Sequence, residues 1–269
     1  MLYAQGIGPV RGIKARKAVQ KVLQQVAVIG VRDRESKAEL SDMGVTRPPI
    51  HVTADAVLSM HPVDKAIGRQ ILERHGFTGG RRKVGIAVRN WQGHQAYKDA
   101  IAEAADRLQQ QEDVDIIFIP MQHPEDVDAG RDIADRMKRA AIVLDDRYST
   151  VEFMSLMGCM DAVIANRLHA LIFSALMETP ATAISYDPKI DSFIHLIGDR
   201  VCGTTESVTA ESLASRVSQQ LAQGGLAPAI KARLNHLRRQ SLRNAYLALR
   251  ILEGRDGVRK RLEQHRRSL

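Results

Sequence analysis

The sequence contains few cysteines, few aromatic residues and no long apolar run. Its 269 residues include two cysteines, and aromatic residues make up 4% of the chain. Cys159 and Cys202 are too few for a disulfide framework and lack the spacing of a metal motif, which favours a reducing, cytoplasmic compartment. The longest apolar runs fall far short of the about 20 residues that a membrane-spanning helix needs. The first residues also lack the basic start and apolar core of a secretory signal peptide.

Motifs for several common kinds of chemistry are missing as well. No group of Cys, His, Asp and Glu has the spacing of metal ligands, and no serine lies in a G-x-S-x-G motif. The glycines of AQGIGPVRG, residues 4–12, do not complete a G-x-G-x-x-G pattern, and a proline stands where the helix would begin. This stretch is therefore a weak nucleotide-binding motif. The sequence predicts neither a metal site nor a bound cofactor.

The positive charge of the chain is concentrated near its C-terminus. Residues 228–269 hold 12 Lys or Arg and 3 Asp or Glu, whereas the rest of the chain holds 27 and 28. A nearly neutral body with a basic C-terminal segment argues against a surface that coats nucleic acid. Apolar residues at helical spacing, such as Leu234, Leu237 and Leu249, predict a long helix over 228–252. Its arginines form either a solvated face or a contact with an anionic membrane, where each adds about 1 kcal/mol.

Short apolar runs alternate with stretches of helical period, which predicts an α/β fold with parallel sheets and helical crossovers. The predicted strands are residues 2–7, 26–31, 50–53, 83–88, 114–119, 140–144, 161–165 and 181–185. The segment 77–83, with Gly79–Gly80 and three cations, predicts a boundary. We expect a partial N-terminal Rossmann-like domain over 1–78, a complete one over 79–227, and a basic helix and tail over 228–269. With three strands, the first domain is expected to be truncated.

Arg167 and His169 follow the predicted strand 161–165 directly. In a parallel sheet this edge faces the N-terminus of the next helix, whose free N–H groups attract phosphate or carboxylate. Arginine adds a two-pronged donor, and histidine adds a proton donor that titrates near neutral pH. The pair therefore suits an anionic substrate that gains or loses a proton. The alternative is that His169 packs against the helix start while Arg167 pairs with a nearby carboxylate.

Further polar residues follow neighbouring predicted strands. Arg89 follows strand 83–88, Lys189 follows the Asp-Pro turn after strand 181–185, and Gln122 and His123 follow strand 114–119. Parallel strands would bring all of them to one sheet edge, where they could line a cleft. The alternative for each is an ordinary surface position. If Arg89 and Arg167 point into one cleft, a small dianion between them becomes the simplest explanation.

Two residues of the N-terminal part are also candidates. Arg32 belongs to a run of alternating charges over residues 30–40, which forms either a salt-bridge network or an edge that binds an acceptor. Asp55 is either a helix cap or a ligand of a sugar. The sequence leaves both alternatives open.

Several stretches together resemble the polysaccharide pyruvyl transferase family, of the CsaB type. They occur in order over most of residues 1–200: QGIGP (5–9), VRDRES (31–36), TAD (53–55), GIAVR (85–89) and DAVIANRLH (161–169). The chain departs from the family pattern in two places. It lacks the Asn-x-Gly-Asp stretch near the start, and Ala56 follows Asp55 where proline is usual.

The resemblance implies a GT-B-like fold of two Rossmann-like domains, with the active site in the cleft between them. It implies an enzyme that transfers pyruvate from phosphoenolpyruvate onto a sugar as a ketal, without a cofactor. The implied acceptor is a lipid-linked precursor of a cell-wall polysaccharide with an N-acetylmannosamine unit. Such an enzyme would act at the inner face of the plasma membrane, where the basic C-terminal segment would hold it, and would bind no nucleic acid.

The resemblance also implies roles for individual residues. His169 and Arg167 match the catalytic pair, with His169 as the general acid. Arg89, Arg167, Leu168 and Lys189 match the donor-binding positions, Lys189 most loosely. The acceptor-binding candidates are Arg32, Asp55, Gln122 and His123. Two alternatives are a nucleotide-sugar glycosyltransferase of the same architecture and a truncated relative without catalytic activity.

Overall fold

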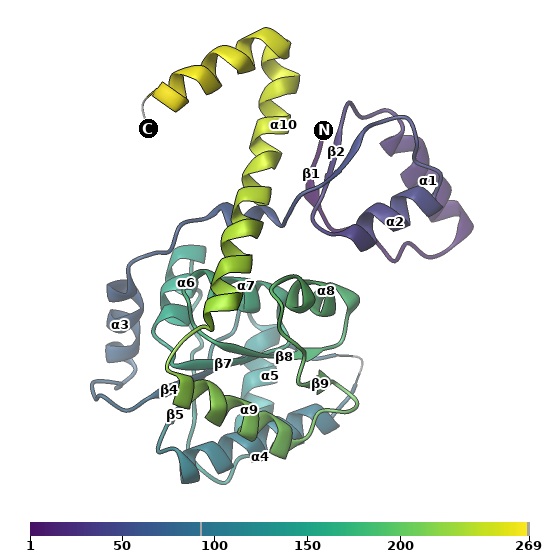
Figure 1. Cartoon of the computed structure of the whole chain (residues 1–269). Coiled ribbons are helices and arrows are strands. Elements are labelled where there is room, and N and C mark those ends of the chain that lie inside the picture. Colours follow the sequence, from purple (N-terminus) through teal and green to yellow (C-terminus); the bar gives the residue numbers. More distant parts are fainter. Residues whose placement is uncertain (92, 268–269) are drawn as a thin grey trace. The chain divides into compact units, whose positions relative to one another are not determined.

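The chain forms two compact units in a computed structural model that describes residues 1–91 and 93–267, with side chains up to residue 253 (Figure 1). The first unit comprises Met1–Met60 and the chain from Asn235 onward, and the second comprises His61–Leu234. Strands and helices alternate along both, as predicted.

The first unit is built on a three-stranded parallel sheet in the order β1-β2-β3. Its core consists of apolar side chains from the sheet, two helices and the loop after α2, among them Leu23, Ile29, Val31 and Leu40. Helix α2 begins where the Asp33 carboxylate accepts a hydrogen bond from the Ser36 amide, a standard N-cap. The elements are β1 (Leu2–Gln5), α1 (Ile13–Leu23), β2 (Ile29–Val31), α2 (Arg34–Asp42), β3 (Ile50–Val52) and η1 (Ala56–Ser59).

The last helix, α10 (Pro228–Arg267), completes the first unit through buried polar side chains. Asn244 is fully buried, accepts a hydrogen bond from Thr53 Oγ1 at 2.8 Å and donates one to the Ala54 carbonyl at 3.2 Å. Ser241 Oγ donates to the Asp55 carbonyl at 2.9 Å. A Cβ on Gly30 of β2 would lie 2.7 Å from the amide oxygen of Asn244, so glycine is required there. Ser241 and Asn244 thus fix α10 beside the end of β3.

The second unit has six parallel strands in the order β6-β5-β4-β7-β8-β9. The order reverses between β4 and β7, which makes this pair the topological switch point, where open α/β sheets bind their ligands beyond the carboxyl ends of the strands. The strands are β4 (Lys83–Ala87), β5 (Asp115–Phe118), β6 (Ile142–Val143), β7 (Ala162–Ala165), β8 (Ala181–Ser185) and β9 (Gly203–Thr204).

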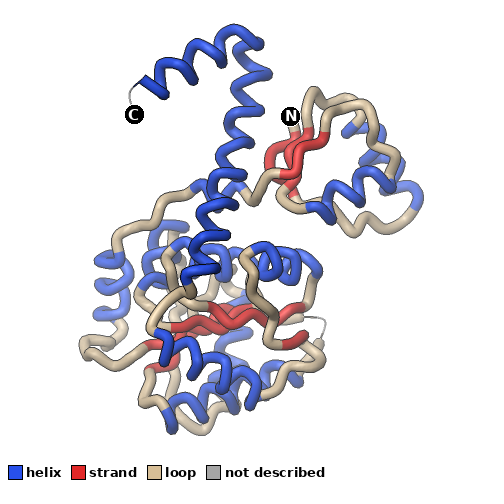
Figure 2. Tube along the Cα trace, viewed as in Figure 1, coloured by secondary structure: helices blue, strands red, loops and turns tan. Residues whose placement is uncertain are grey.

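Helices cover both faces of the second sheet, which forms the central layer of this unit in Figure 2. One face packs against α4, α5 and α9 in a single apolar core. On the other, α7 packs against α6 and α8. The helices of this unit are α3 (Lys65–Arg74), α4 (Ala96–Gln111), α5 (Glu125–Ala134), α6 (Thr150–Gly158), α7 (Leu168–Leu176), α8 (Pro188–Leu196) and α9 (Ala210–Gln223).

The eight predicted strands are all present, and β9, which has only two residues, was not predicted. The predicted boundary at residue 78 differs from the division at Met60. The reason is α3, which packs on α6 of the second unit: Ser155 Oγ accepts from the Gly68 amide at 2.7 Å and donates to the Asp64 carbonyl at 2.6 Å. Gly79–Gly80 therefore lies in the loop before β4. Among the described residues, no helix combines the length and apolar character needed to cross a membrane.

Replacing Gly68 with alanine should destabilise the protein, although alanine is the better helix former by about 1 kcal/mol. Its Cβ would lie 2.6 Å from the Ser155 backbone, and forcing α3 away from α6 costs about 1–3 kcal/mol. We expect Gly68→Ala to lower the free energy of unfolding in urea titrations. The control Gln70→Ala, on the exposed side of α3, should change it by less than about 0.5 kcal/mol. A more stable Gly68→Ala variant would contradict this packing.

Candidate functional site

A buried asparagine joins the two strand ends at the switch point of the second unit. Asn166, the residue after β7, is fully buried. Its Oδ1 accepts a hydrogen bond from the Arg89 amide at 2.9 Å, and its Nδ2 donates to the Arg89 carbonyl at 3.2 Å. The Tyr97 hydroxyl donates to the same carbonyl at 2.7 Å. These bonds fix the backbone of Arg89 at the carboxyl edge of the sheet.

The Arg89 side chain lies beside a pair of neighbouring aromatic rings. Its guanidinium carbon is 5.9 Å from the ring centre of Trp91 and 5.8 Å from that of Tyr186, and the two ring centres are 4.2 Å apart. Lys189 Nζ lies 5.4 Å from the ring centre of Tyr186. Cations at such distances are attracted to ring faces. Arg89 and Lys189 therefore share one aromatic ring, as expected if both belong to one site.

The charge of Arg89 is not neutralised by a carboxylate among the residues that the structure describes. Its Nε is buried and has no hydrogen-bond partner there. A buried donor without a partner is rare and calls for an explanation, such as a ligand that supplies the acceptor. At the end of a parallel strand, such a cation is available to an anion.

Arg167, in contrast, is paired with a carboxylate. Its Nε donates to Asp126 Oδ2 at 2.9 Å, its Nη2 donates to the other carboxylate oxygen, and Nη2 also donates to Gln122 Oε1 at 3.2 Å. The Asp126 side chain is completely buried and accepts the amides of Met121 and Gln122 as well. Of the two alternatives for Arg167, the structure shows pairing with a carboxylate. This bidentate pair links the start of α5 to the end of β7.

The remaining donor-side candidates follow β7 and β8. Lys189 Nζ donates to Asp187 Oδ2 at 3.1 Å, and Asp187 also caps α8 by accepting the Lys189 amide. His169 is exposed in the first turn of α7, with its ring centre 6.2 Å from that of Phe173. The Leu168 side chain is 6% exposed and belongs to the core. Leu168 can therefore serve a ligand only through its amide, at the free N-terminus of α7.

The four acceptor-side candidates do not gather in one place. Gln122 contacts Arg167, whereas His123 Nε2 is 2.9 Å from the Asp145 carbonyl, after β6. Arg32 and Asp55 belong to the first unit and form an ion pair at 3.3 Å. Arg32 also pairs with Asp33, and Asp55 caps η1, so the structure shows the salt-bridge network and the helix cap.

Five residues of this site were not predicted from the sequence. Trp91 had a usable signal, because it is the only tryptophan of the chain and lies two residues after Arg89. Tyr186 and Asn166 each directly follow a predicted strand, which is a weaker signal. For Asp126 and Tyr97 there was no signal in the sequence, since their contacts with Arg167 and Arg89 depend on how the sheet folds. The five residues are Trp91, Tyr97, Asp126, Asn166 and Tyr186.

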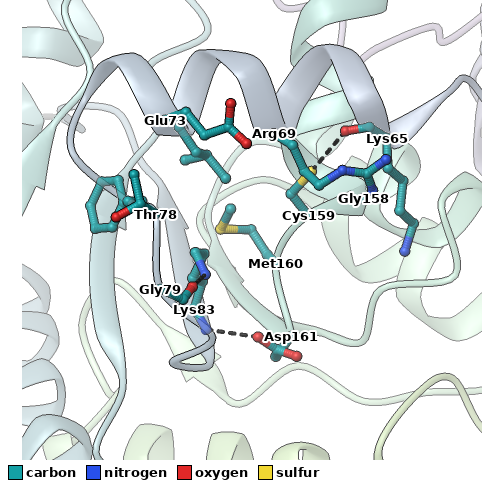
Figure 3. A pocket seen from close by; sticks show the side chains of 12 residues that line it. Lys65, Arg69, Glu73, Thr78, Gly79, Lys83, Gly158, Cys159, Met160 and Asp161 are labelled. Carbon is teal, nitrogen blue, oxygen red and sulfur yellow. Dashed lines mark hydrogen bonds between the residues drawn. The ribbon is translucent and has the colours of Figure 1, made fainter.

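A cavity of about 360 Å³ lies near the opposite, amino-terminal edge of the second sheet (Figure 3). It is lined by α3 residues, including Lys65 and Arg69, and by Cys159, the residue after α6. Burial raises the pKa of the Cys159 thiol, and Arg69 and Lys65 oppose the shift. A protonated thiol is a poor nucleophile. Three or more metal-ligating side chains do not cluster anywhere in the described part of the chain.

A family model described as polysaccharide pyruvyl transferase matches residues 1–188. A comparison with curated protein sequences gives no match.

Solved structures share the fold at low sequence identity. A protein assigned as a UDP-N-acetylglucosamine 2-epimerase from Listeria monocytogenes has a TM-score of 0.66 and 14% identity, over 94% of this chain and 68% of that one. The S. aureus MnaA–UDP complex has a TM-score of 0.58 and 11% identity, over 89% and 62%. A glycosyltransferase from Rickettsia africae has a TM-score of 0.53 and 15% identity, over 93% and 66%.

These structures have the GT-B fold, which confirms the predicted GT-B-like α/β class with parallel sheets. At these identities the likeness concerns the fold alone. The chain spans 62% to 69% of the length of the first three such structures.

The Arg167–Asp126 pair should show strong energetic coupling. Removing either partner leaves the other buried without its counter-charge, a change that costs several kcal/mol. A double-mutant cycle with Arg167→Met and Asp126→Asn should give a coupling energy of at least about 2 kcal/mol in urea unfolding. The control is the exposed pair Arg107–Glu103, whose charged atoms are 2.6 Å apart. For this pair a coupling energy of about 0.3–0.5 kcal/mol is expected. Equal coupling in both cycles would contradict a structural role for the buried pair.

Proposed function

Because this chain belongs to the polysaccharide pyruvyl transferase family, we propose that it transfers pyruvate from phosphoenolpyruvate onto a sugar as a ketal and releases phosphate. The observation that carries the proposal is the state of Arg89. This cation is held at the switch point by two aromatic rings, and no carboxylate of the described residues neutralises it. Phosphoenolpyruvate carries a phosphate and a carboxylate, and so requires such groups.

The donor would bind across the ends of β4, β7 and β8. The Arg89 guanidinium can donate two hydrogen bonds to one anionic group of phosphoenolpyruvate. Lys189, whose ammonium also lies near the Tyr186 ring, adds a second cation. The amide of Leu168 adds the partial positive charge of the α7 N-terminus. Arginine has five N–H donors, and Asp126 and Gln122 accept from Nε and Nη2 of Arg167. Among the described residues this leaves Nη1 of Arg167 to donate to an oxygen of phosphoenolpyruvate.

His169 is the proposed general acid. Ketal formation requires a proton on the methylene carbon of phosphoenolpyruvate, which makes C2 electrophilic. One sugar hydroxyl then adds to C2, and a second displaces the phosphate, so that two C–O bonds form and one C–O bond to phosphate breaks. An imidazolium near the methylene carbon can supply the first proton, and the neutral ring can then accept one from a hydroxyl. Such a group contributes about 10²- to 10⁴-fold in rate.

The proposed acceptor is an N-acetylmannosamine unit of a lipid-linked cell-wall precursor at the cytoplasmic face of the membrane. Among the acceptor-side candidates, Arg32 and Asp55 engage each other, and Gln122 and His123 have local partners. Acceptor binding by any of the four would therefore require an exchange of these partners, and their role stays a prediction.

The second candidate function is that of a nucleotide-sugar glycosyltransferase. It is favoured by the likeness in fold to the S. aureus MnaA–UDP complex and to a glycosyltransferase. A diphosphate would also require cations at the ends of parallel strands. The two functions differ in which anion stabilises the folded protein. A ligand at 100 times its Kd stabilises the native state by about 2.7 kcal/mol, so phosphoenolpyruvate and a UDP-sugar can be compared by thermal shift.

Replacing Arg89 with methionine should abolish stabilisation by phosphoenolpyruvate, because this removes a cation of the site that no carboxylate of the described residues neutralises. Wild type should show a concentration-dependent rise in Tm with phosphoenolpyruvate and none with UDP-N-acetylglucosamine. The control Arg131→Met removes an exposed arginine that pairs with Asp145, and should keep the full shift. Stabilisation of Arg89→Met equal to that of wild type would remove Arg89 from the donor site.

Replacing His169 with glutamine should separate binding from turnover. Because His169 is exposed and outside the core, the variant should keep the shift in Tm with phosphoenolpyruvate. Acceptor-dependent phosphate release, measured with an N-acetylmannosamine glycolipid, should fall by about 10²- to 10⁴-fold. The matched control His195→Gln, near the end of α8, should leave both readouts unchanged. Phosphate release by His169→Gln at the wild-type rate would exclude His169 as the general acid.

A further inference from the structure

We infer that one exposed face of α10 in the first unit docks on an anionic lipid surface, with leucines entering the headgroup region and arginines contacting the phosphates. This face, here termed the arginine–leucine face, consists of Arg239, Leu242, Arg243, Leu249 and Arg250. The inference rests on the proposed function only for its purpose, namely access to a lipid-linked acceptor. Docking itself can be measured without any reaction.

The helix has two distinct faces between residues 237 and 250. Leu237, Ser241 and Asn244 recur at helical spacing and are buried. Leu242 and Leu249, seven residues apart, lie on another side and are 57% and 40% exposed. A helix needs one face with apolar contacts or hydrogen bonds to stay packed, and Leu237, Ser241 and Asn244 provide that face. In the described structure, Leu242 and Leu249 lie outside it.

The arginine–leucine face is rich in positive charge. Residues 235–252 contain four arginines and no Asp or Glu. The Arg243 guanidinium donates to the Gln240 side-chain oxygen at 2.8 Å, and Arg250 lies 5.8 Å from the ring centre of Tyr246. Both are neutral partners, so the charge of each arginine is retained.

The positive charges of these arginines affect a histidine on the neighbouring strand. The pKa of His51, in β3, is lowered by burial first and then by the charges of Arg243, Lys37 and Arg250. The charges of Arg243 and Arg250 thus disfavour, after burial, a further positive charge at this position. Such a surface attracts anions over about a Debye length.

The combination of leucine and arginine selects a bilayer over nucleic acid. Phosphate backbones are bound by cations and polar groups at a wet surface, where two exposed leucines contribute nothing. A helix in the membrane interface uses both, because the apolar side chains enter the acyl boundary while the cations contact anionic headgroups.

The test is co-sedimentation of the full chain with vesicles of phosphatidylcholine and phosphatidylglycerol, compared with phosphatidylcholine alone. Wild type should sediment with the anionic vesicles only. Each arginine near the surface is worth about fivefold in affinity, so Arg239→Gln/Arg243→Gln/Arg250→Gln should bind about 100-fold more weakly. Leu242→Ser/Leu249→Ser should also bind at least about tenfold more weakly, since the apolar contribution is lost.

A matched control removes three other exposed cations. Lys138→Gln/Arg139→Gln/Arg147→Gln changes the net charge by the same amount in the second unit, and should leave vesicle binding within about twofold of wild type. Equal loss in this control, or unchanged binding of the leucine variant, would mean nonspecific electrostatic adsorption and would overturn the inference. Equal sedimentation with neutral vesicles, or none with either kind, would overturn it too.

Two further measurements separate this inference from its alternatives. Binding of a DNA duplex that depends on the arginines but not on Leu242 and Leu249, without vesicle binding, would favour nucleic acid and overturn the inference. Stabilisation by phosphoenolpyruvate should be the same in wild type and in both α10 variants. A protein that docks on vesicles but is not stabilised by phosphoenolpyruvate would contradict the proposed function while leaving the docking face intact.

Discussion

The proposed donor site of the second unit depends on an arginine whose charge the described residues do not neutralise. Asn166 fixes the backbone of Arg89 between β4 and β7, and Trp91 and Tyr186 hold its side chain. Aromatic faces attract a cation without cancelling its charge, whereas a carboxylate would make it unavailable. The open charge lies where the order of the sheet reverses, which is where the strand ends leave room for a ligand.

The neighbouring Arg167 differs from Arg89, because a carboxylate neutralises its charge. Its bidentate contact with the buried Asp126 ties α5 to the strand end after β7. When the groups of a charged site are already held in place, they need not be reorganised as the ligand binds. One arginine thus gives rigidity to the edge of the sheet, while the other stays available to an anion. A similar division occurs in the first unit, where Asn244 and Ser241 hold α10 by one face and leave another exposed.

The strands and the edge of the sheet could be predicted from the sequence, but the partners of the site could not. The strands could be predicted because apolar runs of β-branched residues mark them. The expected parallel order of these strands then placed Arg89 and Lys189 at one edge of the sheet. Nothing local indicated that Asp126 would neutralise Arg167, because 41 residues separate them. The predicted domain boundary at residue 78 stays a prediction, and the two compact units divide at Met60 for a related reason. The contact of Gly68 with Ser155 spans 87 residues, whereas Gly79–Gly80 signals only a turn.

Arg89 is the group proposed to bind a small dianion at this edge. The most direct test is an NMR titration that follows the Nε–H signal of Arg89, a buried donor for which the described residues supply no acceptor. Addition of phosphoenolpyruvate should move this signal in a saturable way, because the ligand supplies the missing acceptor. An Arg89 signal that stays fixed at saturating phosphoenolpyruvate, while signals elsewhere in the protein respond, would contradict the account.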